Sequence, residues 1–262
     1  MKLFYRLILT LIVFFTALTL QAQVKKIVAT KRVASKSQKK ITTKSVIKKP
    51  IKAVTEKTQG VRVRITTDLG EIIVRLSDKT PLHRDNFIKL VKEHFYDSLL
   101  FHRVIPDFMI QGGDLSSKNA VSGVMLGGGD IGYTVPAEFD TTLYHKKGAL
   151  AAARNNNPQK ASSGCQFYLV QGKKHTDEEL NSIEKSNNLK FSSARRMTYK
   201  MLGGTPRLDM NYTVFGEVES GLNIIEQITL LSRDNLNRPL TDIRMRMELI
   251  PEIKKVINNK EK

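Results

Sequence analysis

Residues 101–114 place two hydrogen-bonding side chains in an apolar background. Arg103 and Gln111 share this segment with two phenylalanines, a methionine and two isoleucines. Burying a guanidinium beside apolar groups is costly unless it is hydrogen-bonded, so its position needs a reason. One hypothesis is an arginine that donates hydrogen bonds to a ligand in a dry pocket. The alternative is an arginine that backbone carbonyls satisfy within an ordinary core.

Other motifs that could have a chemical function are better explained by structural roles. Residues 83–86 (His-Arg-Asp-Asn) are similar to a kinase catalytic loop, but Leu90 stands where that loop needs an asparagine. We therefore interpret them as surface charge on a helix. Residues 127–129 are three glycines without the Gly-Lys-Ser/Thr ending of a phosphate loop, which predicts a flexible turn. The five histidines lack the spacing of metal ligands, so we expect no metal site.

Composition limits the class of protein. The chain has 262 residues, of which 40% are hydrophobic, enough for a packed core. Its single cysteine, Cys165, excludes an intramolecular disulfide and is interpreted as a small residue at the edge of the core.

The segment 101–114 resembles the signature of the cyclophilin-type peptidyl-prolyl isomerases. Residues 148–154 with 163–168 are similar to the second pocket segment of this family, and 208–216 to its third. The resemblance covers about 61–250, except for a helical insertion described below.

The resemblance implies a role for each matching residue. Arg103 corresponds to the catalytic arginine that donates to the prolyl nitrogen, and Gln111 to the amide that holds this arginine and the substrate backbone. The other matches imply substrate-binding residues. The hydrophobic bed for the proline ring corresponds to Phe108, Met109, Tyr168 and Leu208, with Phe101 beneath it. Ala153 and Arg154 correspond to a backbone clamp for the residue before the proline, and Tyr212 to part of an aromatic wall.

Three positions depart from the family pattern. Arg207 stands where many members carry tryptophan, Tyr212 where many have a pocket histidine, and Tyr168 where many have phenylalanine. The two tyrosines keep an aromatic wall, so we expect activity to survive. The missing tryptophan implies weakened binding of the cyclic-peptide inhibitor of the family.

Hydrophobic periodicity and turn residues predict the elements that position these side chains. Thr80 is the expected N-cap of the first helix, with Pro81 at its first position. Residues 176–179 form a capping box for another helix. The expected strands are 61–67, 71–76, two short ones around Pro106, 148–154, 166–171, 212–218 and 241–250; the expected helices are 81–95, 175–189, 192–202 and 221–231.

These elements predict a mainly β fold, a closed antiparallel eight-stranded β-barrel capped by two α-helices, as in cyclophilins. The capping helices are 81–95 and 221–231. The other two form a helical insertion at about 173–203. We expect a single domain over 61–250, followed by a charged C-terminal tail, 251–262.

The N-terminal region predicts export. Residues 1–23 carry Lys2 and Arg6 before an apolar run that is shorter than a bilayer core, followed by a small residue, which is typical of a signal peptide. An uncleaved anchor is the alternative. The Lys-rich residues 24–60 contain no Phe, Tyr or Trp and one acid, Glu56, which predicts a disordered tether. Alternatively, this tether docks on an anionic surface without specificity; no specific nucleic acid is expected.

The resulting hypothesis is an exported peptidyl-prolyl cis-trans isomerase, located in the periplasm, on the outer membrane or outside the cell. It would accelerate X–Pro isomerisation during folding of exported proteins by stabilising the twisted amide. Proline-containing polypeptides are the expected partners, with no cofactor and a monomeric state. The alternatives are a non-catalytic module that binds proline peptides and a chaperone scaffold on the same fold.

Overall fold

The computed structural model describes residues 60–251. The expected signal peptide 1–23, the tether 24–60 apart from Gly60 and the tail after Pro251 lie outside the described residues. Within 60–251, no helix has the length and apolar character needed to span a membrane.

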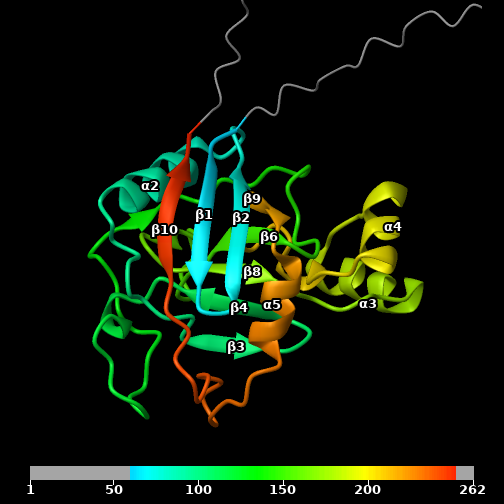
Figure 1. Cartoon of the computed structure of the whole chain (residues 1–262). Helices are drawn as coiled ribbons and strands as arrows, with labels where there is room; N and C mark the ends of the chain where they lie inside the picture. Colours follow the sequence, from blue (N-terminus) through cyan, green and yellow to red (C-terminus); the bar gives the residue numbers. More distant parts are fainter. Residues whose placement is uncertain (1–59, 252–262) are drawn as a thin grey trace, which may run out of the picture. The chain divides into compact units, whose positions relative to one another are not determined.

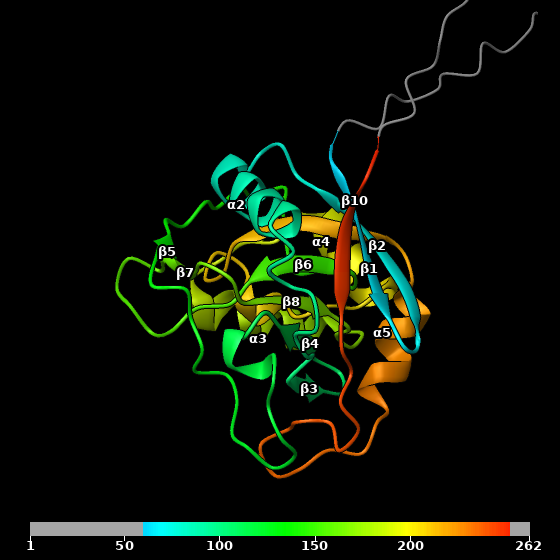
Figure 2. The same ribbon diagram turned by 60° about the vertical axis from the view of Figure 1, so that its left-hand side comes forward.

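Eight antiparallel strands form one curved sheet in the order β10-β1-β2-β9-β6-β8-β4-β3 (Figures 1 and 2). A separate pair, β5 and β7, lies beside it. The strands are β1 (Arg62–Thr67), β2 (Gly70–Leu76), β3 (Arg103–Ile105), β4 (Met109–Gly112), β5 (Thr134–Val135), β6 (Ala149–Ala152), β7 (Ser162–Ser163), β8 (Phe167–Val170), β9 (Val214–Ser220) and β10 (Arg246–Ile250).

The prediction of a closed barrel is wrong, because the sheet is open between β3 and β10. The segments that precede these strands, residues 98–101 and 243–245, are joined by one isolated bridge, Leu100↔Arg244, and by three backbone hydrogen bonds. Within β3 itself, the edge bonds to a loop and not to β10: the N–H of Val104 donates to the carbonyl of Asn237 at 2.8 Å. A loop therefore occupies the edge that β10 would need in order to close the barrel.

Four α-helices lie within the described residues. Two of them, α2 and α5, lie at opposite ends of the curved sheet, and α3 and α4 stand together outside it (Figure 1). All four helices predicted from the sequence are thus confirmed, and α3 and α4 lie within residues 173–203, where two helices were expected. Their bounds are α2 (Pro81–Lys92), α3 (Asp177–Asn187), α4 (Ser193–Met201) and α5 (Leu222–Thr229).

Of the two helix N-caps predicted from the sequence, one is confirmed in full and the other only in position. The capping box of α3 is confirmed, with Thr176 and Glu179 each bonding the backbone of the other. Thr80 occupies the N-cap position of α2 but makes no side-chain cap bond. The carboxylate of Glu138 replaces it, accepting from the backbone N–H groups of Leu82 and His83 at 3.0 Å each.

The interpretation of residues 83–86 as surface charge is wrong for His83, whose side chain is 3% exposed. Its Nδ1 lies 2.7 Å from Glu138 Oε2, and its Nε2 lies 2.9 Å from Ser162 Oγ. Burial lowers the pKa of His83, and the Glu138 carboxylate opposes this effect. The histidine therefore joins α2 to two distant segments instead of facing water.

The curved sheet has apolar residues on both faces over β4, β8 and β6, which explains their nearly continuous burial. Ile110, Leu150 and Leu169 belong to the main core inside the curve. A second cluster on the other face comprises Met109, Ala149, Ala151, Ala153, Tyr168, Val170 and Val214. Cys165, interpreted from the sequence as a residue at the edge of the core, belongs to the main core cluster, and burial raises the pKa of its thiol to about 12.

Candidate functional site

Strand register places the two candidate catalytic residues directly opposite each other. Arg103 of β3 pairs with Gln111 of β4, and Gln111 pairs with Tyr168 of β8. Tyr168 in turn pairs with Ala151 of β6. Residues paired across strands project to the same face, so this row of side chains crosses the outer face of the sheet.

A pocket of about 120 Å³ lies on this face. Nine residues line it, and all nine were predicted from the sequence: Arg103, Phe108, Met109, Gln111, Ala153, Arg154, Tyr168, Leu208 and Tyr212. Phe101 is not among them. It is 1% exposed, belongs to the main core and packs edge-on against Phe167, so it supports the sheet from the opposite face.

Arg103 enters the pocket with most of its donors unused. Its Nη1 donates to Gln111 Oε1 at 3.3 Å, and it forms no ion pair within the described residues. Burial lowers the pKa of Arg103, while Tyr212 acts in the opposite direction. The pKa nevertheless starts far above neutrality, so the guanidinium stays charged. A half-buried cation without a carboxylate partner is thus available to a ligand.

Gln166 completes the support of Arg103, and sequence reasoning did not assign it a role. Gln111 Nε2 donates to Gln166 Oε1 at 3.0 Å. Gln166 Nε2 in turn donates to the carbonyls of Gly127 and Gly129, at 3.0 and 2.8 Å. The glycine turn thus fixes the orientation of both amides. The only signal available was the position of Gln166 inside the segment 163–168.

Ala153 and Arg154, the two residues after β6, differ in the hydrogen bonding of their backbone groups. The N–H of Ala153 donates to Gln166 and its carbonyl accepts from Ser163, at 2.9 and 2.8 Å. The N–H and carbonyl of Arg154 have no hydrogen-bond partner within residues 60–251. This pair of groups can hold an extended peptide, as the resemblance implied for Arg154.

A buried polar chain connects the pocket to α4. The hydroxyl of Tyr168 lies 2.9 Å from His145 Nε2, and His145 Nδ1 lies 2.9 Å from Asp209 Oδ1. Tyr199 of α4 donates to Asp209 Oδ2 at 2.6 Å. Asp209 directly follows the pocket residue Leu208, so α4 is bonded to the chain that forms one pocket wall. His145, Tyr199 and Asp209 were not predicted as parts of the site.

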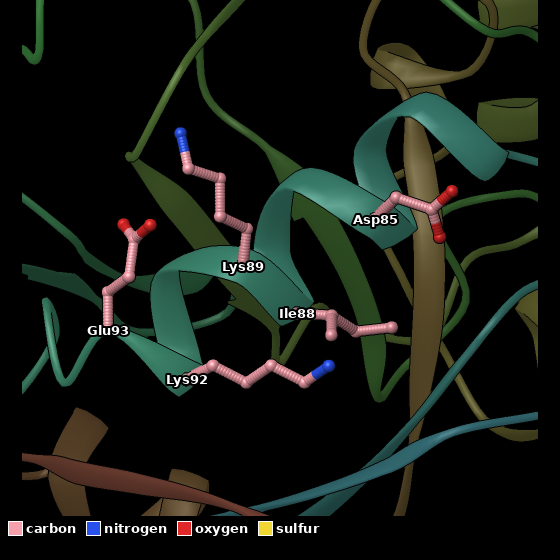
Figure 3. Close-up of a pocket in the computed structure, with 5 residues that line it drawn as sticks. All are labelled: Asp85, Ile88, Lys89, Lys92 and Glu93. Carbon is pink, nitrogen blue, oxygen red and sulfur yellow. The ribbon is translucent and has the colours of Figure 1, made fainter.

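A larger hollow of about 550 Å³ lies along the outer side of α2. Asp85, Ile88, Lys89, Lys92 and Glu93 line it, and their side chains spread outward from this one helix (Figure 3). Because they do not converge on a common point, this hollow lacks the arrangement of a binding site.

Comparisons with known proteins agree with this geometry. Residues 62–248 match the family model described as cyclophilin type peptidyl-prolyl cis-trans isomerase/CLD. A peptidyl-prolyl cis-trans isomerase from Schizosaccharomyces pombe is 31% identical over 185 residues, which are 70% of this chain and 94% of that protein. A relative from Streptococcus pyogenes is 35% identical over 190 residues. The matched part is 70% of this chain but only 37% of that relative's length.

Comparison with solved structures also finds cyclophilins. A cyclophilin type peptidyl-prolyl cis-trans isomerase from Cryptosporidium parvum superimposes with a TM-score of 0.53 at 20% identity, covering 73% of this chain and 99% of its own. The open sheet with its helices is therefore a cyclophilin fold. The chain belongs to the family of cyclophilin-type peptidyl-prolyl cis-trans isomerases, which confirms the resemblance seen in its three pocket segments.

Proposed function

We propose that this isomerase acts on X–Pro bonds of exported polypeptides, with Arg103 as its catalytic residue. The observation that carries the proposal is the guanidinium of Arg103, which forms no ion pair within residues 60–251, beside an apolar bed of Phe108, Met109 and Leu208. The Cryptosporidium parvum relative was crystallised in the presence of the dipeptide Ala-Pro, which supports proline-containing peptides as ligands.

Arg103 can lower the barrier because the twisted amide differs chemically from both planar isomers. Rotation about an amide bond has a barrier of about 18–20 kcal/mol, since it breaks resonance. The prolyl nitrogen then regains its lone pair and becomes an acceptor. A charged donor in a partly dry pocket stabilises this state and gains little from the planar ones. An acceleration of about 10⁵-fold needs about 7 kcal/mol of such differential binding.

The neighbouring residues hold the substrate so that the donor meets the nitrogen. Gln111 and Gln166 orient Arg103 through their shared hydrogen bond. The apolar bed grips the proline ring, and the free backbone groups of Arg154 hold the residue before it. No proton transfer or covalent intermediate is required, because the reaction only redistributes conformers.

Export is the second part of the proposal. It is supported by Lys2 and Arg6 ahead of a short apolar run, with the lysine-rich residues 24–60 as a tether to a membrane or cell-wall compartment. Proteins that fold after export expose X–Pro bonds whose uncatalysed exchange takes tens to hundreds of seconds. We therefore place the protein in the periplasm, at the outer membrane or outside the cell.

Exchange NMR on a short X–Pro peptide tests the catalytic assignment. Arg103→Ala should lose at least about 10²-fold in kcat/KM while its melting temperature changes little, because the side chain is half-buried and makes one long hydrogen bond. Arg246→Ala is the matched control, since Arg246 of β10 is exposed and does not line the pocket. Equal rates for Arg103→Ala and the parent would refute the mechanism. Binding without faster exchange in the parent would leave a proline-binding module.

A further inference from the structure

Two guanidinium groups and no carboxylate line the pocket. Arg103 and Arg154 are the charged residues among its nine lining side chains, and neither forms an ion pair within residues 60–251. Lys160 is not part of this lining but donates to the carbonyl of Met210 at 3.0 Å, two residues from both Leu208 and Tyr212 of the pocket. A cleft lined by charges of one sign attracts ligands of the opposite sign.

The side chain of Arg154 is held in place but keeps free donors. Its Nε donates to the carbonyl of Asn211 at 2.9 Å, and its Nη1 to that of Asn155 at 3.1 Å. Its guanidinium carbon lies 4.7 Å from the centroid of the Tyr212 ring. A guanidinium has five N–H groups, so these contacts leave several unspent. An arginine fixed in this way is preorganised to bind a planar carboxylate.

The backbone of Arg154 determines which substrate residue comes close to this guanidinium. Its free N–H and carbonyl can pair with a residue that offers both a donor and an acceptor. Proline has no N–H, so the pairing residue is the one before it. Residues paired across extended chains project side chains to the same face, about 5 Å apart. The side chain before the proline therefore lies next to that of Arg154.

We propose that Arg154 is a specificity-determining residue that selects substrates with Asp or Glu directly before the proline. This inference rests on the proposed function and goes beyond it by naming the substrate class. The role of Arg154 differs from that of Arg103, because Arg154 acts on the preceding side chain and leaves the prolyl nitrogen to Arg103.

The test compares three peptides that differ only in the residue before proline: Glu, Gln or Lys. Exchange NMR at low ionic strength gives kcat/KM for each, relative to its uncatalysed rate. We expect Glu to exceed Gln by about fivefold, Lys to fall below Gln, and both differences to shrink as salt screens the charges. In Arg154→Gln the Glu-to-Gln ratio should fall to about one, with the rate for the Gln peptide reduced less.

Two further variants keep the test decisive. Arg246→Gln removes the same charge from an exposed position on β10, outside the pocket, and should preserve the Glu-to-Gln ratio. Arg154→Lys keeps the charge and should retain part of the preference, even if Arg154→Gln folds poorly.

Each other outcome has a distinct meaning. Equal rates for the three peptides in the parent protein would overturn the inference while leaving the isomerase intact. A ratio lowered equally by Arg246→Gln and Arg154→Gln would assign the preference to the overall field and overturn the role of Arg154. Absence of catalysed exchange with any peptide would instead contradict the proposed function.

Discussion

At the scale of single residues, the pocket was the most predictable part of the molecule. Arg103 and Gln111 stand out in the sequence because a cation and an amide are conspicuous in an apolar segment. Gln166 does not stand out, because its role depends on the carbonyls of Gly127 and Gly129, which the fold brings to it from a distant turn. A hydrogen-bond partner that is remote in sequence leaves no local pattern.

The amide pair yields a prediction about catalysis. Gln166→Ala should lower kcat/KM by about tenfold, because Gln111 loses the partner that orients it towards Arg103. Exchange NMR measures the rate, and the melting temperature reports on the fold. Gln227→Ala, on the exposed side of α5, is the control and should change neither. A Gln166→Ala variant as active as the parent would show that Gln111 holds Arg103 unaided.

His102 yields a prediction about acid stability. Its side chain is 3% exposed, and burial lowers its pKa to about 4 from 6.5. Between these values the unfolded chain binds a proton that the folded chain does not, so stability is lost as pH falls from about 6.5 to 4. The loss from this group is of the order of 3 kcal/mol and levels off below pH 4.

Urea unfolding at several pH values checks this expectation. The free energy of unfolding of the parent should fall across the stated window, and His102→Gln should show a shallower slope there. His94→Gln is the control, because His94 is exposed on the surface. Identical slopes for the parent and both variants would contradict the assignment.

At the scale of elements, local signals predicted nearly every helix and strand, with most bounds a few residues too long; β9, in contrast, continues to Ser220, beyond its predicted end at 218. The start of α2 shows what such local signals do not predict. Thr80 and Pro81 correctly mark the first turn, but the cap itself is Glu138, which lies far along the chain. Sequence therefore indicated where the helix begins and could not indicate what satisfies its backbone.

The anchoring of α4 yields a prediction about stability. Tyr199→Phe removes the hydrogen bond to the buried carboxylate of Asp209 and should lower the free energy of unfolding by about 2 kcal/mol. Tyr144→Phe is the matched control: its hydroxyl donates to Thr198, a neutral partner, and its loss should cost less than about 1 kcal/mol. Urea denaturation measures both. Equal costs would mean that Asp209 does not depend on Tyr199.

At the scale of the whole molecule, the set of strands was predictable and the closure of the sheet was not. Closure depends on which segment takes the free edge of β3, and the loop at Asn237 takes it. β10 and the loop at Asn237 are both distant from β3 in sequence, so which of them bonds to β3 depends on the folded structure and not on a local sequence pattern. The charge distribution, in contrast, is readable from sequence alone: basic residues crowd 24–60 while Glu56 is the only acid there.

Deletion of residues 24–60 tests the proposed tether. We expect unchanged kcat/KM on short peptides, because the pocket is built entirely from residues beyond 100. Binding to anionic vesicles should weaken strongly, and in the parent it should vanish at high salt. Co-sedimentation with vesicles at two salt concentrations measures this. Salt-independent binding would indicate a contact other than charge.

The pairing of β1 with β10 also constrains how the protein reaches its native state. Arg62 lies opposite Ile250, so the first strand of the sheet finds one neighbour only after almost all of the domain has been made. Such a large sequence separation makes folding slow relative to local helix formation. The same adjacency means that a short linker could join the two ends of the domain, with new termini opened in an exposed turn. A protein that catalyses a slow folding step thus has a topology that leaves its own last strand to complete the sheet.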